Sequence, residues 1–158
     1  MCHCPLLFFF AAAENEIPSW RVTVPSSVRG VPGSCVLIPC LYDFPAPEKT
    51  LTQFTGIWRN EQHQPIYHPV KSEVMQQYRD RTELVGDIMQ KNCSLKIEPL
   101  QASDAGPFYF RIEIADYDQY SYSHNKISIA MISKYQVLLK TPSGSCILYL
   151  NNTYTVLI

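Results

Sequence analysis

Apolar and polar residues alternate with a period of two along much of the chain. The clearest run covers residues 108–114, "FYFRIEI", in which every second residue is a Phe or an Ile. The residues between them include Arg111 and Glu113, which belong to the opposite parity. Such alternation predicts a strand that buries one face and exposes the other.

Shorter runs of the same kind recur, separated by Pro, Gly, Asp and Ser. They predict strands over residues 20–28, 34–42, 54–60, 65–71, 93–100, 108–114 and 126–132. Pro25 is expected to break the first of these, as edge strands permit. The stretch 116–123, "DYDQYSYS", is predicted as the turn between the last two strands. No window has convincing helical periodicity, so the sequence predicts an all-β sandwich.

The composition limits which cellular compartment and which classes of partner are expected. The chain has 158 residues, of which 46% are hydrophobic, enough for one core of ordinary domain size. A net charge of -1 provides no field that would recruit nucleic acid, so no nucleic-acid partner is expected. Six Cys in so short a chain indicate an oxidising compartment, provided that the chain is secreted. The apolar run at residues 4–13, ending in small residues, is typical of a signal peptide, with a buried first strand as the alternative.

The number and spacing of these strands are typical of an immunoglobulin sandwich of the variable type, the V-set. Trp58 is then the core tryptophan, and Phe110 stands where such a domain has its second cysteine. Cys40 and Cys93 lie on neighbouring strands of one sheet (B and E in that fold), and both point inward by parity. They are predicted to form a disulfide within that sheet, which leaves Phe110 to fill the space between the sheets.

Two charged residues, Arg81 and Asp104, resemble the salt bridge that closes one end of variable domains.

Arg111 is predicted to lie on the outer face of the sheet that contains residues 108–114, because its parity is opposite to that of Phe110. Two interpretations remain open from the residues alone. The arginine is either solvated and paired with Glu113 or another strand neighbour, or it is an anchor that grips a carboxylate bidentately. The tyrosines and serines of 116–123 beside it favour an acidic sugar as the ligand.

The motifs "SW", "GSCVLIPCLYDFP", "RTELVGD", "KNCSL" and "FYFRIEI" together resemble the N-terminal variable domain of the sialic-acid-binding immunoglobulin-like lectins, over residues 18–132. The resemblance implies that Arg111 forms a salt bridge with the sialic acid carboxylate. It implies that Trp20 packs on the N-acetyl methyl group, and that Tyr120 contacts the glycerol side chain. Hydrogen bonds to the ligand are expected from the main chain of three residues, Tyr117, Gln119 and Ser121. Tyr67 and His63 are candidates for contact with the next sugar.

The resemblance has further implications. Cys35 is expected to be unpaired in this chain or to bridge to a following immunoglobulin domain, with Cys146 as an alternative partner. Asn92 and Asn151 lie in glycosylation sequons. Residues 1–17 are interpreted as a signal peptide or its remnant, and residues 133–158 as a non-homologous tail of a truncated or mis-spliced product. No apolar run long enough to span a membrane is present in the sequence.

The implied function is a lectin of the secretory pathway and the extracellular face of the plasma membrane, with sialylated glycoproteins or gangliosides on opposing cells as partners. No cofactor and no enzymatic activity are expected, because the His and Cys residues have neither metal-ligand nor nucleophile spacing. The alternative is a protein-binding adhesion module, homophilic or heterophilic, that uses the same sheet without binding sugar. A third possibility is an immune-type receptor domain that has lost its ligand.

Overall fold

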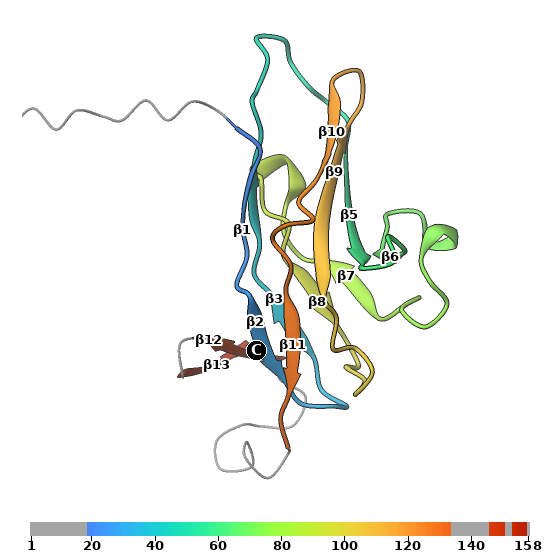
Figure 1. Cartoon of the computed structure of the whole chain (residues 1–158), viewed down its shortest axis with the longest axis vertical. Helices are drawn as coiled ribbons and strands as arrows, with labels where there is room; N and C mark the ends of the chain where they lie inside the picture. Colours follow the sequence, from blue (N-terminus) through green and yellow to red (C-terminus); the bar gives the residue numbers. More distant parts are fainter. Residues whose placement is uncertain (1–18, 134–145, 151–152, 158) are drawn as a thin grey trace, which may run out of the picture.

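The structure, a computed structural model, describes residues 19–133, 146–150 and 153–157, and within them two sheets lie in separate layers (Figure 1). One sheet has the strand order β10-β9-β5-β6 and the other β13-β12-β3-β8-β7. β1 and β4 form a further two-stranded sheet, and so do β11 and β2. The strands are β1 (Arg21–Thr23), β2 (Ser27–Gly30), β3 (Val36–Ile38), β4 (Leu41–Asp43), β5 (Phe54–Asn60), β6 (Pro65–Tyr67), β7 (Thr82–Leu84), β8 (Leu95–Ile97), β9 (Phe108–Ile114), β10 (Asp118–Ser121), β11 (Ser128–Met131), β12 (Cys146–Leu150) and β13 (Thr153–Leu157). Two short 3₁₀ turns, η1 (Lys71–Glu73) and η2 (Ile88–Gln90), complete the described elements.

The alternation over residues 108–114 produces β9, one of the two central strands of the four-stranded sheet. Its Phe and Ile side chains are all buried, as the parity predicts. β9 pairs antiparallel with β5 along the whole of both strands and with β10 in a hairpin. Among the described residues no helix is long and apolar enough to cross a membrane.

Prolines divide two of the predicted strands, the first of them as expected and the second not. The predicted strand 20–28 is two strands, because β1 pairs with β4 whereas β2 pairs parallel with β11. Pro25 lies between them and has no N–H to donate to a ladder. The predicted strand 34–42 is likewise interrupted at Pro39, between β3 and β4. The predicted break at Pro25 is confirmed, whereas the prediction of one continuous strand over residues 34–42 is wrong.

Half of the stretch 116–123, which was predicted as a turn, is strand. β10 begins at Asp118, and the hairpin turn is short, closed by a hydrogen bond from the Tyr117 N–H to the Ile114 carbonyl (3.2 Å). The predicted strand 126–132 is present as β11. Polar and aromatic residues alternate over residues 119–123, "QYSYS", so the sequence signal there is a strand at the edge of a sheet.

The backbone beyond the predicted domain joins the second sheet. β12 pairs parallel with β3, with Ile147 opposite Val36, and β13 pairs antiparallel with β12. Cys35 is buried and is disulfide-bonded, so the expectation of an unpaired Cys35 is wrong. The predicted signal segment 1–17 and the sequon residue Asn151 lie outside the described residues.

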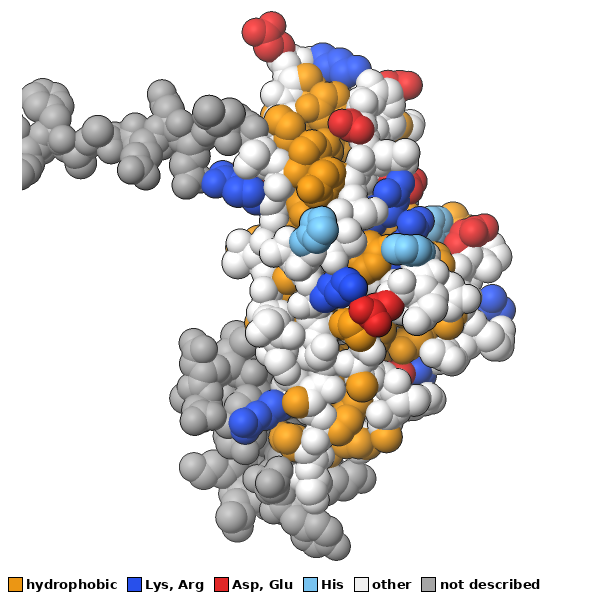
Figure 2. All heavy atoms as spheres, in the orientation of Figure 1, with side chains coloured by type: hydrophobic (Ala, Val, Ile, Leu, Met, Phe, Trp, Pro, Cys, Tyr) orange, Lys and Arg blue, Asp and Glu red, His pale blue; other side chains and the backbone are white. Residues whose placement is uncertain are grey.

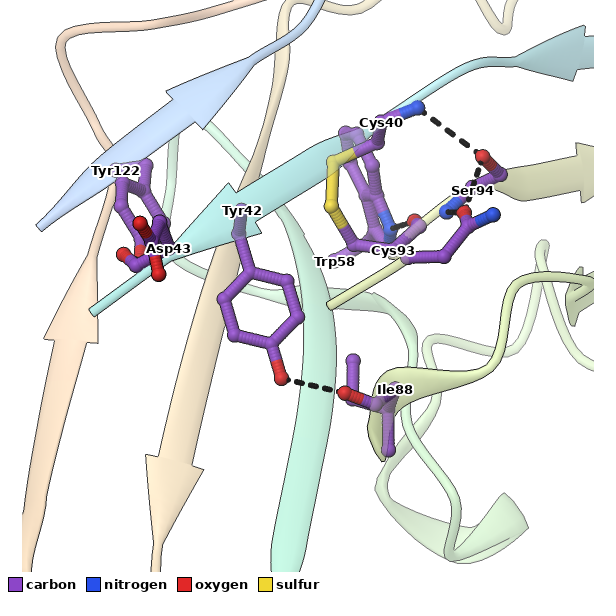
Figure 3. The surroundings of a disulfide bond; sticks show 9 residues. Cys40, Tyr42, Asp43, Trp58, Ile88, Cys93, Ser94 and Tyr122 are labelled. Carbon is purple, nitrogen blue, oxygen red and sulfur yellow. Dashed lines mark hydrogen bonds between the residues drawn. A yellow bond between two sulfur atoms is a disulfide. The ribbon is translucent and has the colours of Figure 1, made fainter. Parts of the chain in front are cut away.

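The predicted disulfide within one sheet is confirmed (Figure 3). Cys40 and Cys93, which are 53 positions apart in the sequence, are bonded with a Cα–Cα distance of 4.9 Å. The Trp58 indole Nε1–H donates to the Cys93 carbonyl at 2.9 Å. The ring of Phe110 lies against Tyr42 and Trp58, with centroids 5.2 and 5.8 Å away. An aromatic cluster therefore fills the space that a cross-sheet disulfide would otherwise occupy.

The predicted salt bridge is confirmed. The Arg81 guanidinium donates to both carboxylate oxygens of Asp104, at 2.7 and 3.1 Å. Asp104 is 1% exposed, and its Oδ2 also accepts from the Gln101 N–H. This bidentate pair joins the segment before β7 to the loop before β9.

Candidate functional site

The Arg111 side chain lies on the outer face of β9, where its parity places it. Its guanidinium is mostly covered, with 16% of the side chain exposed. Three neighbours accept its hydrogen bonds: Nε donates to the Glu113 carboxylate at 2.8 Å, Nη1 to the Ser121 hydroxyl at 2.8 Å, and Nη2 to the Gln119 side-chain carbonyl at 2.6 Å. A guanidinium has five N–H groups, so hydrogen-bonding capacity remains for a ligand.

The hairpin register explains why these side chains converge. Gln119 lies opposite Glu113, and Ser121 lies opposite Arg111. Cross-strand partners share one face of a sheet, so all four side chains stand together on the outer face. The ion pair with Glu113 is the contact that the alternative interpretation of Arg111 expects.

Trp20 and Tyr120 form a stacked aromatic pair on the other side of this hairpin. Their ring centroids are 4.9 Å apart with 11° between the planes, and Phe44 lies 6.1 Å from Trp20. Tyr120 is opposite the buried Ile112, so its ring is on the inner face of the sheet, where Trp20 covers it. Figure 2 shows an apolar stripe running between the positions of β1 and β10. Arg111 and the aromatic pair thus lie on opposite faces of the hairpin.

Between these two faces runs the free edge of β10. β10 is an edge strand among the described residues. The Tyr122 N–H donates to the Phe110 carbonyl. Because antiparallel pairing alternates, the main-chain groups of Gln119 and Ser121 point away from β9. The Tyr117 N–H is already donated within the turn, so only its carbonyl is open to a ligand.

Charges around Asp43 fix the start of β1 beside β10. The Asp43 carboxylate accepts from Lys91 at 2.5 Å and lies 3.8 Å from the Arg21 guanidinium. Its backbone carbonyl accepts from the Tyr122 hydroxyl at 2.7 Å. Burial raises the pKa of Asp43, but the hydrogen bonds from Lys91 and the Phe44 N–H, together with the charges of Lys91 and Arg21, lower it by more, so the net pKa is lowered. The residue next to Trp20 is therefore held by an ionised carboxylate.

A shallow hollow of about 580 Å³ lies beyond Glu113 at the hairpin end of the sheet. Its lining includes the carboxylates of Glu113, Asp116 and Asp118. The acidic lining disfavours a second anionic group at this end of the face. Among the described residues, no group of three His, Cys, Asp or Glu side chains is placed to hold a metal ion.

The two candidates for contact with a further sugar lie apart from each other. Tyr67 is on β6, separated from β9 by β5, and it lines a different hollow with His68 and Lys71. Burial, together with the charge of Glu83, raises the pKa of Tyr67. His63 is in the turn after β5, and its Nδ1 is 2.7 Å from the hydroxyl of Tyr109, which shares the outer face with Arg111. The structure brings His63, but not Tyr67, toward the outer face of β9.

Arg59 is a residue that the sequence reasoning missed. It lies opposite Tyr109 on β5, on the same outer face as Arg111. The signal was present in the sequence, because Arg59 follows the core residue Trp58 and therefore has the opposite parity.

Comparison with known proteins identifies the class. Residues 23–130 match the immunoglobulin V-set domain family. The chain belongs to this family. Solved structures agree on the fold: Duf (Kirre) D1 has a TM-score of 0.50 at 16% identity, covering 73% of this chain and 98% of that one. Dpr1 IG1, solved bound to DIP-eta IG1, has a TM-score of 0.50 at 14% identity, over 73% and 97%.

Similarity to curated proteins indicates a narrower group within this family. Rat myelin-associated glycoprotein is 32% identical over 127 residues, 77% of this chain and 20% of the relative. Human sialic acid-binding Ig-like lectin 5 is 30% identical over 151 residues, 89% of this chain and 27% of the relative. Mouse myeloid cell surface antigen CD33 is 28% identical over 144 residues, 87% and 35%. The resemblance to sialic-acid-binding immunoglobulin-like lectins is thus confirmed, and the motifs "IPCLYDFP" and "YDQYSYS" had indicated myelin-associated glycoprotein first and sialoadhesin second. The chain spans about a fifth to a third of the length of these relatives.

Proposed function

We propose that this domain is a lectin that binds terminal sialic acid on cell-surface glycans and mediates adhesion or recognition between cells. The partners are sialylated glycoproteins or gangliosides on opposing cells, which places the domain on the extracellular face of the plasma membrane. The observation that carries the proposal is the guanidinium of Arg111, held on the outer face of β9 beside the free edge of β10.

The ligand would lie across the edge of β10. Its carboxylate meets Arg111 on the outer face, and the open main-chain groups of Gln119 and Ser121 bond its amide and hydroxyls. Its apolar patches reach the Trp20–Tyr120 pair on the inner face. This site therefore requires a ligand that has a carboxylate and an apolar group on one sugar ring, as sialic acid has.

Glu113 competes with the ligand for the guanidinium. Its carboxylate occupies Nε of Arg111, so the ligand carboxylate binds next to an existing negative charge. A charged contact on a partly exposed face contributes only a few kcal/mol at most. Monovalent binding is therefore expected in the millimolar to high-micromolar range, with useful adhesion through multivalent display.

The second candidate function is a protein-binding adhesion module that uses the same sheet. The Arg111–Glu113 ion pair favours it, because an arginine satisfied by its own strand needs no ligand. The two functions differ in their requirement for sialic acid.

The experiment compares binding of the full chain, displayed multivalently, to cells before and after sialidase treatment. The lectin loses binding after sialidase treatment. Binding to untreated cells should be abolished by Arg111→Ala. Arg111→Lys should reduce this binding at least about tenfold, because Lys keeps the charge but lacks the planar fork. Lys71→Gln, which removes an exposed cation outside the two sheets, is the control and should bind as the unmodified chain does. Binding that survives sialidase treatment would establish the protein-binding alternative.

A further inference from the structure

Cys35 takes part in a disulfide whose partner can be narrowed by elimination. It is 3% exposed and is disulfide-bonded. Cys40 and Cys93 are bonded to each other, so neither of them is this partner. The sequence has six Cys, so the partner within this chain is one of the remaining three, Cys2, Cys4 and Cys146.

The pairing of β12 with β3 places one of these three next to Cys35. The two strands run parallel, with Ile147 opposite Val36, and β12 begins at Cys146. Cys35 and Cys146 each come one residue before this pair, so they have the same register position on neighbouring stretches of backbone. Paired strands are about 4.8 Å apart, and a disulfide joins Cα atoms that are about 4.4–6.8 Å apart. The spacing of the backbone therefore suits a bond between these two residues.

Cys2 and Cys4 lie in the segment 1–17, which the sequence predicts as a signal peptide. A signal peptide is removed from a secreted protein, and its two Cys are removed with it. Four Cys then remain, an even number that two intrachain bonds satisfy. The sequence-based expectation for the N-terminus thus also favours Cys146 as the partner.

We propose that Cys35 and Cys146 form a second intrachain disulfide, which fastens the hairpin of β12 and β13 to the edge of β3. The two thiols are oxidised to one S–S bond, and their two protons and two electrons pass to a low-molecular-weight disulfide, which is reduced to two thiols. The bond uses, within one chain, the cysteine that the resemblance assigned to a bridge between domains. The inference does not depend on the proposed sialic acid site, because β3 and the strand of Arg111 belong to different sheets.

The position of β12 at the edge of β3 indicates what the bond does. β3 has β8 on one side and β12 on the other, and β12 also lies beside β2 (Figure 1). β12 pairs with β3 through a single residue pair, so few main-chain hydrogen bonds hold the hairpin there. An uncovered strand edge has open main-chain groups that can pair with another chain. The covalent bond compensates for the short pairing and keeps this edge covered by the chain's own strands.

Peptide mapping of the unreduced chain identifies the partner, after any unpaired thiols have been alkylated under denaturing conditions. No Lys or Arg lies between Cys35 and Cys40, so trypsin leaves both on one peptide, whereas chymotryptic cleavage after Leu37 separates them. Mass spectrometry should find the peptide with Cys35 joined to the peptide with Cys146, and reduction should release both. Alkylation of Cys35 without reduction, or a bond from Cys35 to any other cysteine, would overturn the assignment.

Cys146→Ser tests whether the bond holds the hairpin in place. Hydrogen exchange should show the amides of β12 and β13 losing protection at least about tenfold, while the amides of β9 keep theirs. Ser145→Ala changes the preceding residue and keeps every Cys, so it is the control and should exchange as the unmodified chain does. Unchanged protection of β12 and β13 in the Cys146→Ser chain would overturn the fastening role of the bond. If that variant does not fold, the peptide map of the unmodified chain still decides the pairing.

Discussion

At the scale of single residues, Arg111 combines two properties that the sequence left as alternatives. It is paired with Glu113, and it also lies on an open face beside a free strand edge. Parity alone placed the side chain on the outer face, since only the position relative to Phe110 was needed. Its partners Gln119 and Ser121 depend on the hairpin register, which the sequence did not fix because residues 116–123 were predicted as a turn.

Glu113→Gln should tighten binding of a sialoside about two- to fivefold. The amide oxygen can still accept from Arg111 Nε and keep the guanidinium in place, but the negative charge that repels the ligand carboxylate is gone. Titration calorimetry or NMR measures the sialoside affinity of the unmodified chain and of Glu113→Gln, and the ratio of the two affinities tests the prediction. Weaker binding in the Gln variant would mean that the charge of Glu113 supports the ligand rather than competing with it.

Trp20→Ala should weaken sialoside binding about three- to tenfold and have little effect on the Arg111 hydrogen bonds, because the two lie on opposite faces of the hairpin. The stacking of Trp20 on Tyr120 was not predicted, since it depends on the pairing of β1 with β4, which the sequence pattern does not specify. Glycan binding by the Ala variant is compared with that of Val24→Ala, which removes another partly buried apolar side chain after the same strand. Equal losses in the two variants would indicate a general effect on packing.

At the scale of elements, the connections between strands are made by tyrosines as well as by the disulfide. The Tyr42 hydroxyl donates to the Ile88 carbonyl in η2 at 2.7 Å, and the Tyr122 hydroxyl to Asp43 at the end of β4. Burial raises the pKa of Tyr42, with a smaller contribution from the charge of Asp87. Burial raises the pKa of Tyr122 in the same way, and the charges around it add to the effect. Both phenols are therefore held neutral in the folded chain.

The stability of the fold should fall as the pH rises above about 10, the ordinary pKa of tyrosine. A pKa that is higher in the folded state means that the unfolded chain loses its phenolic protons first. The contribution is fully present below pH 10 and is lost as the pH rises toward the folded pKa values. Urea unfolding between pH 8 and pH 11 tests this, and Tyr42→Phe with Tyr122→Phe should make the dependence less steep. An unchanged dependence would assign the effect to other groups.

The bond between Cys40 and Cys93 shows which part of the fold the sequence could predict. Inward parity on two neighbouring strands was sufficient, and the structure confirms the pair. The disulfide bonding of Cys35 within this chain was not the main expectation, because the resemblance pointed to a bridge to a following domain. The break at Pro25 was predicted from the proline itself, whereas the interruption at Pro39 was missed because alternation continues through it.

Replacing Cys40 and Cys93 together by Ala should cost about 4 kcal/mol of unfolding free energy, since the bond closes a loop of 53 residues. Both sulfurs are buried beside Trp58, so small cavities add to the loss. Chemical denaturation measures it, and the near-ultraviolet signal of Trp58 reports whether the packing survives. A loss below about 1 kcal/mol would contradict the account of the core.

At the scale of the whole molecule, the salt bridge between Arg81 and Asp104 closes the sandwich at the end of β9 away from the β10 hairpin. Asp104→Ala leaves the guanidinium of Arg81, only 10% exposed, without its carboxylate and should destabilise the domain by about 3–5 kcal/mol. Thermal unfolding measures this. Because the change is remote from Arg111, sialoside binding of the folded fraction should be unaffected. A specific loss of binding would mean that the two ends of the sheet are coupled.

The proposed sialic acid site combines one cation on the outside of the sandwich, Arg111, with an indole on the other side of the same hairpin, Trp20. The most direct test is an NMR titration of the ¹⁵N-labelled chain with a simple α-sialoside, following the Arg111 Nε–H and the Trp20 Nε1–H. The account predicts that both signals shift together and saturate between high-micromolar and millimolar ligand, with the Gln119 and Ser121 amides. The same titration should leave Arg81 unchanged. No shift of Arg111 at saturating sialoside, or shifts confined to other faces, would contradict it.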